Sequence, residues 1–236
     1  MIRVAAVGDL HVGEDSRGQF ADAFTHVGDC ADVLLLAGDL TRLGRTEEMA
    51  VLVEELAGMT VPCCAVAGNH DYESDRWPEL AAMLRDAGVT VLEEGTTCLE
   101  VDGTSLGVVG TTGFGGGFAG ASGSDFGEPE MKAFVRRTRR MADGLRAGLD
   151  DLGTDVRVAL LHFAPIKDTL GAERREIYPF LGSYLLGEAI DTAGADLVVH
   201  GHAHSGTEAG VTPGGVPVRN VALPVIQDAF RVYAIG

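Results

Sequence analysis

Residues 33–41 read VLLLAGDLT: five apolar residues in a row, then a glycine and an aspartate. A short apolar run that ends in glycine and a polar residue predicts a buried strand followed by a sharp turn. The same order recurs in residues 2–11, IRVAAVGDLH, and in residues 62–71, PCCAVAGNHD. The repeated pattern predicts an α/β protein whose strands end in polar side chains.

Further short apolar runs alternate with amphipathic stretches. They predict strands at residues 89–92, 97–101, 105–109, 156–161, 197–199, 218–222 and 230–235. Helical spacing of apolar residues predicts one helix from Thr46 to just before Gly58 and a longer one that begins at Pro129. No linker or internal repeat interrupts this order, so we expect a single domain over residues 1–236.

Composition limits the classes of function. The formal charge of -17 and the sequence pI near 4.6 argue against a protein that coats nucleic acid or binds an anionic membrane. An anionic substrate stays possible, because bound metal ions can reverse the local field. The four cysteines form no CxxC pair, and no apolar run reaches membrane-spanning length or resembles a leader. We therefore expect reduced thiols and a cytoplasmic location.

Metal-binding residue types stand at the ends of five predicted strands. The carboxyl ends of such strands are where α/β sheets build sites. Each short motif alone is weak, since Asp-x-His and Gly-Asp also occur in ordinary turns and caps. The ordered set of five predicts a metal site. The residues at these five ends that could bind a metal are Asp9, His11, Asp39, Asn69, His70, Asp71, His162, His202 and His204.

With these motifs in order, the chain resembles the calcineurin-like metallophosphoesterase superfamily from Asp9 to His204. The sequences GDLT at 38–41 and GNHD at 68–71 look most like those of its bacterial branch of cyclic-nucleotide phosphodiesterase-like proteins. That branch often has a second histidine and two prolines after the position of His162, where this chain has FAP at 163–165. The resemblance implies a four-layer α/β sandwich, with two mixed sheets face to face and helices outside.

The resemblance also implies which of these residues are metal ligands and what each of them does. Asp9, His11 and His204 would hold one metal ion. Asn69, His162 and His202 would hold a second. Asp39 would bridge them, and His70 would stabilise the transition state and protonate the leaving group. The mixed nitrogen and oxygen donors suit Mn, Fe or Zn. Two divalent ions, two carboxylates and a bridging hydroxide leave a charge of about +1 for a phosphate.

The function that follows is hydrolysis of a small phosphodiester, such as a cyclic nucleotide, at a binuclear centre with a bridging hydroxide. One alternative is a phosphomonoesterase or nucleotide pyrophosphatase on the same centre. Another is a binding scaffold, because some relatives, such as a retromer subunit, keep the fold with an impaired site. All seven ligand positions are filled here, which favours an enzyme. A DNA nuclease is disfavoured by the acidic charge and a missing capping domain.

Several polar residues have two interpretations each. Asp71 either orients His70 or caps a turn. His200 either supports the ligands or packs in the core, and His26 is expected to be structural. The longer helix carries a basic stripe, either a solvated face or a partner-binding patch. The stripe consists of Lys132, Arg136, Arg137, Arg139 and Arg140.

Residues 113–127 are rich in glycine and contain Phe114, Phe118 and Phe126. One interpretation is a mobile loop whose aromatic rings help to define the substrate pocket. The other is a surface loop whose phenylalanines pack against the helix that begins near Pro129.

Overall fold

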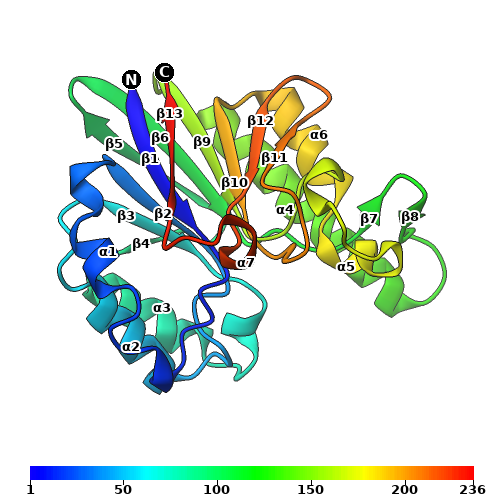
Figure 1. Cartoon of the computed structure of the whole chain (residues 1–236). Helices are drawn as coiled ribbons and strands as arrows, with labels where there is room; N and C mark the ends of the chain where they lie inside the picture. The colour runs from blue at the N-terminus through cyan, green and yellow to red at the C-terminus, as the bar shows by residue number, and fades with distance from the viewer.

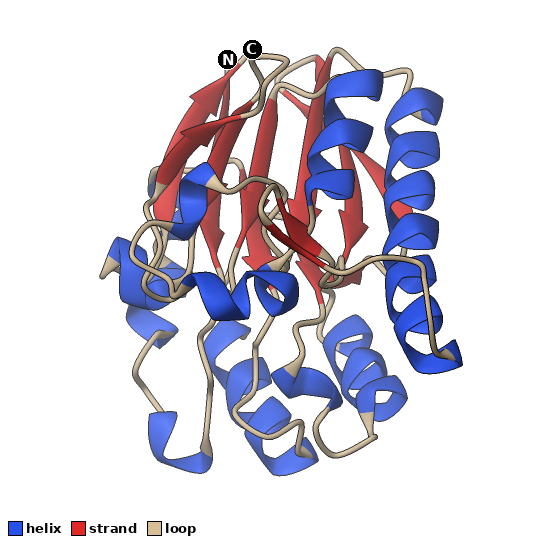
Figure 2. Ribbon diagram, turned by 90° about the vertical axis from the view of Figure 1, so that its right-hand side faces the viewer, coloured by secondary structure: helices blue, strands red, loops and turns tan.

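Two mixed β-sheets lie face to face, and helices cover their outer faces, as the computed structural model of residues 1–236 shows (Figures 1 and 2). This is the four-layer sandwich that the family resemblance implied, and that expectation is confirmed. The first sheet has the strand order β13-β1-β2-β3-β4. Its strands are β1 (Ile2–Val7), β2 (Val33–Ala37), β3 (Cys63–Val66), β4 (Thr90–Val91) and β13 (Arg231–Ile235).

Strands β1 to β4 are parallel, and β13 closes one edge by pairing antiparallel with β1, so that Ile2 lies opposite Ile235. The two chain ends therefore lie side by side at one end of the sandwich (Figure 1). The predicted strand over residues 89–92 is shorter in the structure, where only Thr90 and Val91 pair with β3.

The second sheet has the order β11-β12-β10-β9-β6-β5. Its four central strands are parallel, and the edge strands β5 and β11 are antiparallel to their neighbours. The strands are β5 (Gly95–Val101), β6 (Thr104–Thr111), β9 (Val156–Leu161), β10 (Leu197–His200), β11 (Ala209–Val211) and β12 (Pro217–Asn220). A separate hairpin, β7 (Gly117–Phe118) and β8 (Ala121–Ser122), lies within the glycine-rich segment.

In strand β2, polar residues do not alternate with apolar ones, and the position of the strand explains why. Leu34 and Leu36 point into a core shared with the first three helices, whereas Leu35 points into the core between the two sheets. Both faces of the strand are therefore buried, and a strand buried on both faces reads as a continuous apolar run. Cys63 and Cys64 divide in the same way between the two cores, as adjacent residues of a strand must.

Helices form the two outer layers. The first sheet carries α1 (Ala21–Thr25), α2 (Thr46–Leu56) and α3 (Trp77–Asp86). The second carries α4 (Pro129–Asp151) and α6 (Tyr184–Ala193). The short helices α5 (Tyr178–Leu181) and α7 (Leu223–Ile226) complete the set, with 3-10 turns at Glu14–Ser16, Val27–Asp29, His70–Tyr72, Asp168–Leu170 and Arg175–Ile177. None of the helices combines the length and apolar character that a membrane crossing requires.

Candidate metal centre

The loops that follow β1, β2, β3, β9 and β10 meet at one end of the sandwich. The loops that follow β1 and β2 are joined by main-chain hydrogen bonds. The N–H of Asp9 donates to the Gly38 carbonyl at 2.9 Å, and the N–H of His11 donates to the Asp39 carbonyl at 3.0 Å. The N–H of Gly201 after β10 donates to the His162 carbonyl after β9 at 3.1 Å. Parallel pairing thus brings the candidate ligands of both sheets to one place.

The first cluster consists of Asp9, His11, Asp39 and His204, whose ligand atoms all lie within 4.8 Å of one another. His204 Nε2 lies 2.8 Å from Asp9 Oδ1, and His11 Nε2 lies 3.8 Å from Asp39 Oδ2. The Nε2 atom of His11 is buried and has no hydrogen-bond partner. A buried polar atom without a partner is rare in a folded protein, and a metal ion between these side chains would satisfy it.

The second cluster joins Asp39 to His162 and His202. His162 Nδ1 lies 2.8 Å from the Ala37 carbonyl, which can only accept, so Nδ1 carries the proton and Nε2 a lone pair. That lone pair faces Asn69 Oδ1 at 3.1 Å and Asp39 Oδ1 at 3.4 Å. A cation between these three acceptors would satisfy all of them. The donors present therefore fit a second metal ion.

His202 is oriented by a main-chain group. Its Nε2 donates to the carbonyl of Phe180 at 3.0 Å, which leaves Nδ1 as the atom free to bind a metal. The carbonyl of Ala37 does the same for His162. Both imidazoles are thus fixed in one tautomer by carbonyl oxygens of other segments.

Burial also sets the charge of the centre. Desolvation lowers the pKa of His11 and of His202 to about 4, so both rings are neutral near pH 7, the form that binds metals. Desolvation, together with the charge of Asp9, raises the pKa of Asp39 to about 6. Two buried carboxylates repel one another here, and a divalent cation would relieve that repulsion.

The backbone at the centre is unusual. Asp9, His11, Asp39 and His202 have positive φ angles of 57°, 43°, 49° and 70°, a region that non-glycine residues seldom occupy. The loops also approach closely, because a Cβ at Gly68 would collide with the main-chain nitrogen of Asp39. Such conformations persist when surrounding contacts enforce them, and they are frequent at functional sites.

His70 lies at the rim of the centre, with 42% of its side chain exposed. Its Nδ1 donates to the carbonyl of Arg42 at 2.8 Å, so its Nε2 is free and lies 4.0 Å from Asp39 Oδ2. Its ring also contacts that of His11 edge-on, with centroids 4.6 Å apart. The His70 ring is therefore open to solvent, and its Nε2 faces the Asp39 carboxylate.

Asp71 points away from His70. Its buried carboxylate accepts bonds from the N–H of Leu40 (3.2 Å), the N–H and hydroxyl of Thr41 (2.8 and 2.7 Å) and the N–H of Gly68 (2.8 Å). Asp71 therefore caps turns and ties the loop after β2 to the loop after β3. The first interpretation of Asp71, as the group that orients His70, is wrong, because the Arg42 carbonyl does this.

The remaining histidines lie outside the two clusters. His200 is buried, with Nδ1 donating to the Gly201 carbonyl at 2.7 Å and Nε2 accepting from the Thr169 hydroxyl at 2.8 Å, which holds the turn before His202. His26 is exposed just after α1.

The glycine-rich segment is packed against the body of the protein. Phe118 is buried in a small core with Leu181 and Ala203. Phe114 contacts Phe134 of α4, with ring centroids 4.9 Å apart. Phe126 is 81% exposed. Phe114 thus packs against the helix that begins at Pro129, as the interpretation of a surface loop expected. Phe118 packs instead against α5 and the loop after β10.

Comparison with solved structures finds the same fold in several proteins. A phosphopantetheinyl hydrolase from Mycobacterium tuberculosis is 18% identical with a TM-score of 0.71, and the match covers 99% of this chain and 98% of that one. A protein from Thermus thermophilus is 18% identical with a TM-score of 0.57, over 93% of this chain and 88% of that one. No curated protein matches the sequence. The model of the calcineurin-like phosphoesterase family matches residues 2–206, and the chain belongs to that family.

Proposed function

We propose that this metal-dependent phosphoesterase hydrolyses a small phosphodiester, such as a cyclic nucleotide, at a binuclear metal centre. One observation carries the proposal: the carboxylate of Asp39 belongs to both ligand clusters, with Oδ2 toward His11 and Oδ1 toward His162. A carboxylate can bind one ion with each oxygen, so Asp39 is suited to bridge two ions. The orphaned nitrogen of His11 and the facing acceptors of Asn69 and His162 support a separate ion on each side.

The chain supplies both the ligands and a proton donor. Two bound ions, with nitrogen and oxygen donors that suit Mn, Fe or Zn, would polarise the phosphoryl oxygens and acidify a water molecule. The Arg42 carbonyl holds His70 so that its Nε2 faces the substrate side of Asp39. In the protonated imidazolium, Nε2–H would bond to the phosphoryl group and give its proton to the leaving oxygen. Asp71 would keep Asp39 and Asn69 in place by tying their loops together.

The same geometry would serve a phosphomonoesterase or a nucleotide pyrophosphatase. These reactions and diester hydrolysis all need metal ions that bind and polarise the oxygens of a phosphoryl group. A non-catalytic binding scaffold would be expected to bind one metal ion or none. The full ligand set does not favour that alternative. The likeness to a phosphopantetheinyl hydrolase adds a phosphopantetheinyl diester to the compounds that should be tested.

The test is hydrolysis by the Mn-loaded protein. The substrates are bis-p-nitrophenyl phosphate, p-nitrophenyl phosphate, cyclic nucleotides and a phosphopantetheinyl diester. We expect turnover of at least one diester, and its loss in Asp39→Asn but not in Asp86→Asn, which changes an exposed aspartate at the end of α3. Hydrolysis of p-nitrophenyl phosphate alone would support the monoesterase instead. No hydrolysis by a fully metallated protein would refute the proposal.

A further inference from the structure

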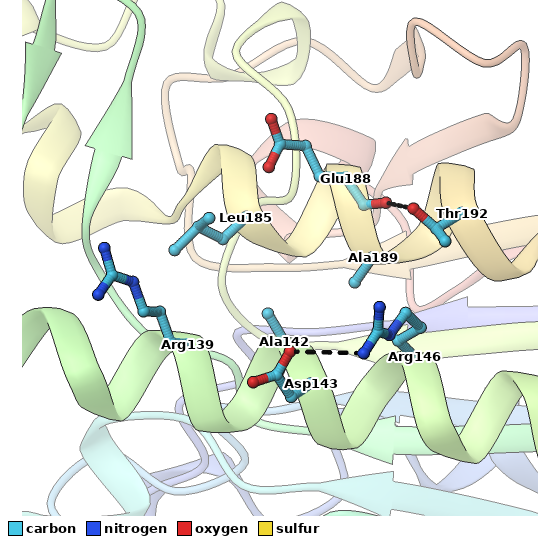
Figure 3. A pocket seen from close by; sticks show the side chains of 8 residues that line it. All are labelled: Arg139, Ala142, Asp143, Arg146, Leu185, Glu188, Ala189 and Thr192. Carbon is cyan, nitrogen blue, oxygen red and sulfur yellow. Dashed lines mark hydrogen bonds and ion pairs between the residues drawn. The ribbon is translucent and has the colours of Figure 1, made fainter.

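The basic stripe of α4 divides into arginines with different surroundings. Arg136 and Arg139 both form ion pairs with Asp125, at 3.2 and 2.7 Å. Arg139 also lines a pocket of about 320 Å³ between α4 and α6, together with Arg146 (Figure 3). Acidic side chains share that pocket, including Asp143, which lies 3.9 Å from Arg146. The pocket's positive charge is therefore largely neutralised, and it offers little to an anionic partner.

Arg137 is different. It is exposed, and its guanidinium carbon lies 4.2 Å from the centre of the Phe114 ring. No carboxylate comes within the 4.0 Å of an ion pair, although the chain has 35 acidic residues and only 18 lysines and arginines. The Phe114 ring supports one face of the planar guanidinium by a cation–π contact, which leaves the N–H groups along its edge available.

A short series of aromatic contacts joins Arg137 to the metal centre. Phe114 contacts Phe163 with centroids 5.8 Å apart, and Phe163 contacts the candidate ligand His202 with centroids 4.4 Å apart. The rings of Phe114 and Phe163 thus connect Arg137 to the side of the centre that His202 forms.

We infer that Arg137 determines specificity by binding a second anionic group of the substrate, a carboxylate or phosphate several bonds from the phosphodiester that is hydrolysed. The inference rests on the proposed function, because it assumes that the metal centre holds that phosphodiester. A guanidinium whose orientation is fixed by a ring presents a fork that matches the oxygens of such a group. The chain has an excess of acidic residues, which repel anions. An unpaired arginine connected to the centre through Phe114 and Phe163 therefore gives the distal anion a favourable place.

The test compares two esters with the same leaving group: p-nitrophenyl butyl phosphate and p-nitrophenyl 4-carboxybutyl phosphate. We expect the Mn-loaded protein to prefer the carboxylated ester in kcat/KM. In Arg137→Gln, which keeps much of the side-chain stem, this preference should fall about 10-fold or more, as the loss of a charge-assisted bond predicts. The change should appear mainly in KM, and Arg137→Lys should restore part of it. Arg140→Gln is the matched control, because Arg140 is exposed on the same helix without an ion pair or ring contact.

Binding separates the inference from the proposed function. Calorimetry would compare butylphosphonate with 4-carboxybutylphosphonate on the Mn-loaded wild type and both glutamine variants. The proposed function fails only if the wild type hydrolyses neither these esters nor any of the diesters named above. In either case the affinity ratio of the two phosphonates decides the role of Arg137. A ratio that is unchanged in Arg137→Gln, or changed equally in Arg140→Gln, overturns the inference.

Discussion

Removal of the Asp71 carboxylate should destabilise the protein before it affects the chemistry. The carboxylate is fully buried and accepts four hydrogen bonds of 2.7–3.2 Å, three of them from main-chain N–H groups. Asp71→Ala would leave those donors buried without partners. Bonds to charged acceptors contribute about 1.5–3 kcal/mol each, but relaxation and entering water recover part of the sum. We expect a loss of about 3–5 kcal/mol in the free energy of unfolding.

For a chain of this length, that loss corresponds to a fall in Tm of about 10 °C. The assay is urea and thermal unfolding of the metal-free protein, because bound metal would itself stabilise the fold and mask the difference. Asp71→Asn keeps the shape and one acceptor oxygen, so we expect a smaller loss, of about 2 kcal/mol. The exposed Asp86 provides the control, and Asp86→Ala should change the stability by less than about 0.5 kcal/mol.

The opposite result would refute this reasoning. If Asp71 acts by orienting His70, Asp71→Asn would lose turnover while its Tm and metal content stay at wild-type values. The structure predicts instead that the Asp71 variants lose free energy of unfolding even without metal or substrate. Activity would then fall because Asp39 and Asn69, on the two loops that Asp71 connects, bind metal less firmly.

Three further outcomes are expected. The metal-loaded protein should contain close to two equivalents of metal by elemental analysis, and Asp39→Asn should contain fewer; one equivalent in both would contradict a bridging role. His70→Ala should keep its metal and lose about 10²–10⁴-fold in kcat, most for a poor leaving group, whereas loss of metal would show that His70 is a ligand. Phe118→Ala should lower stability by about 3–5 kcal/mol, while the exposed Phe126→Ala should change it little; equal effects would argue against a buried Phe118.

The strand ends were predictable because the signal is local. A glycine after an apolar run, followed by a potential ligand, marks both the turn and the residue type, and parallel strands then bring these ends together. The pattern placed Asp9 and His204 at one edge, although they are 195 positions apart, and the family resemblance supplied their pairing. The pattern by itself indicated only an α/β chain, and the four layers were expected from the family resemblance. The burial of strands such as β2 on both faces agrees with that arrangement.

The groups that orient the histidines were not predictable. The carbonyls of Ala37, Arg42 and Phe180 fix three imidazoles, yet every residue has a carbonyl, so nothing in the sequence distinguishes these. Asp71 was ambiguous for a related reason: three of its four bonds come from main-chain N–H groups, two of them on a loop about 30 residues earlier in the chain.

Helices α3 and α6 are absent from the predicted elements. For α3, Trp77, Leu80 and Leu84 do recur at helical spacing and are buried. Pro78 lies beside Trp77 and looks like an interruption in the sequence, but it falls in the first turn, where proline is tolerated. In α6, Gly187 lies in the helix interior, where a glycine weakens the helical signal but is buried beside the Pro165 carbonyl.

The antiparallel pairing of β1 with β13 has a practical consequence for engineering. Because Ile2 lies opposite Ile235, a linker of a few residues would join Met1 to Gly236 without disturbing either strand. New ends could then be opened in the exposed β5–β6 turn at Asp102 and Gly103. The ligand loops lie at the carboxyl ends of the parallel strands, whereas β1 begins at the opposite end (Figure 1). A circular permutant of this kind should therefore keep the loops with the candidate ligands intact, and a fluorescent protein fused at Met1 or Gly236 would stand clear of them.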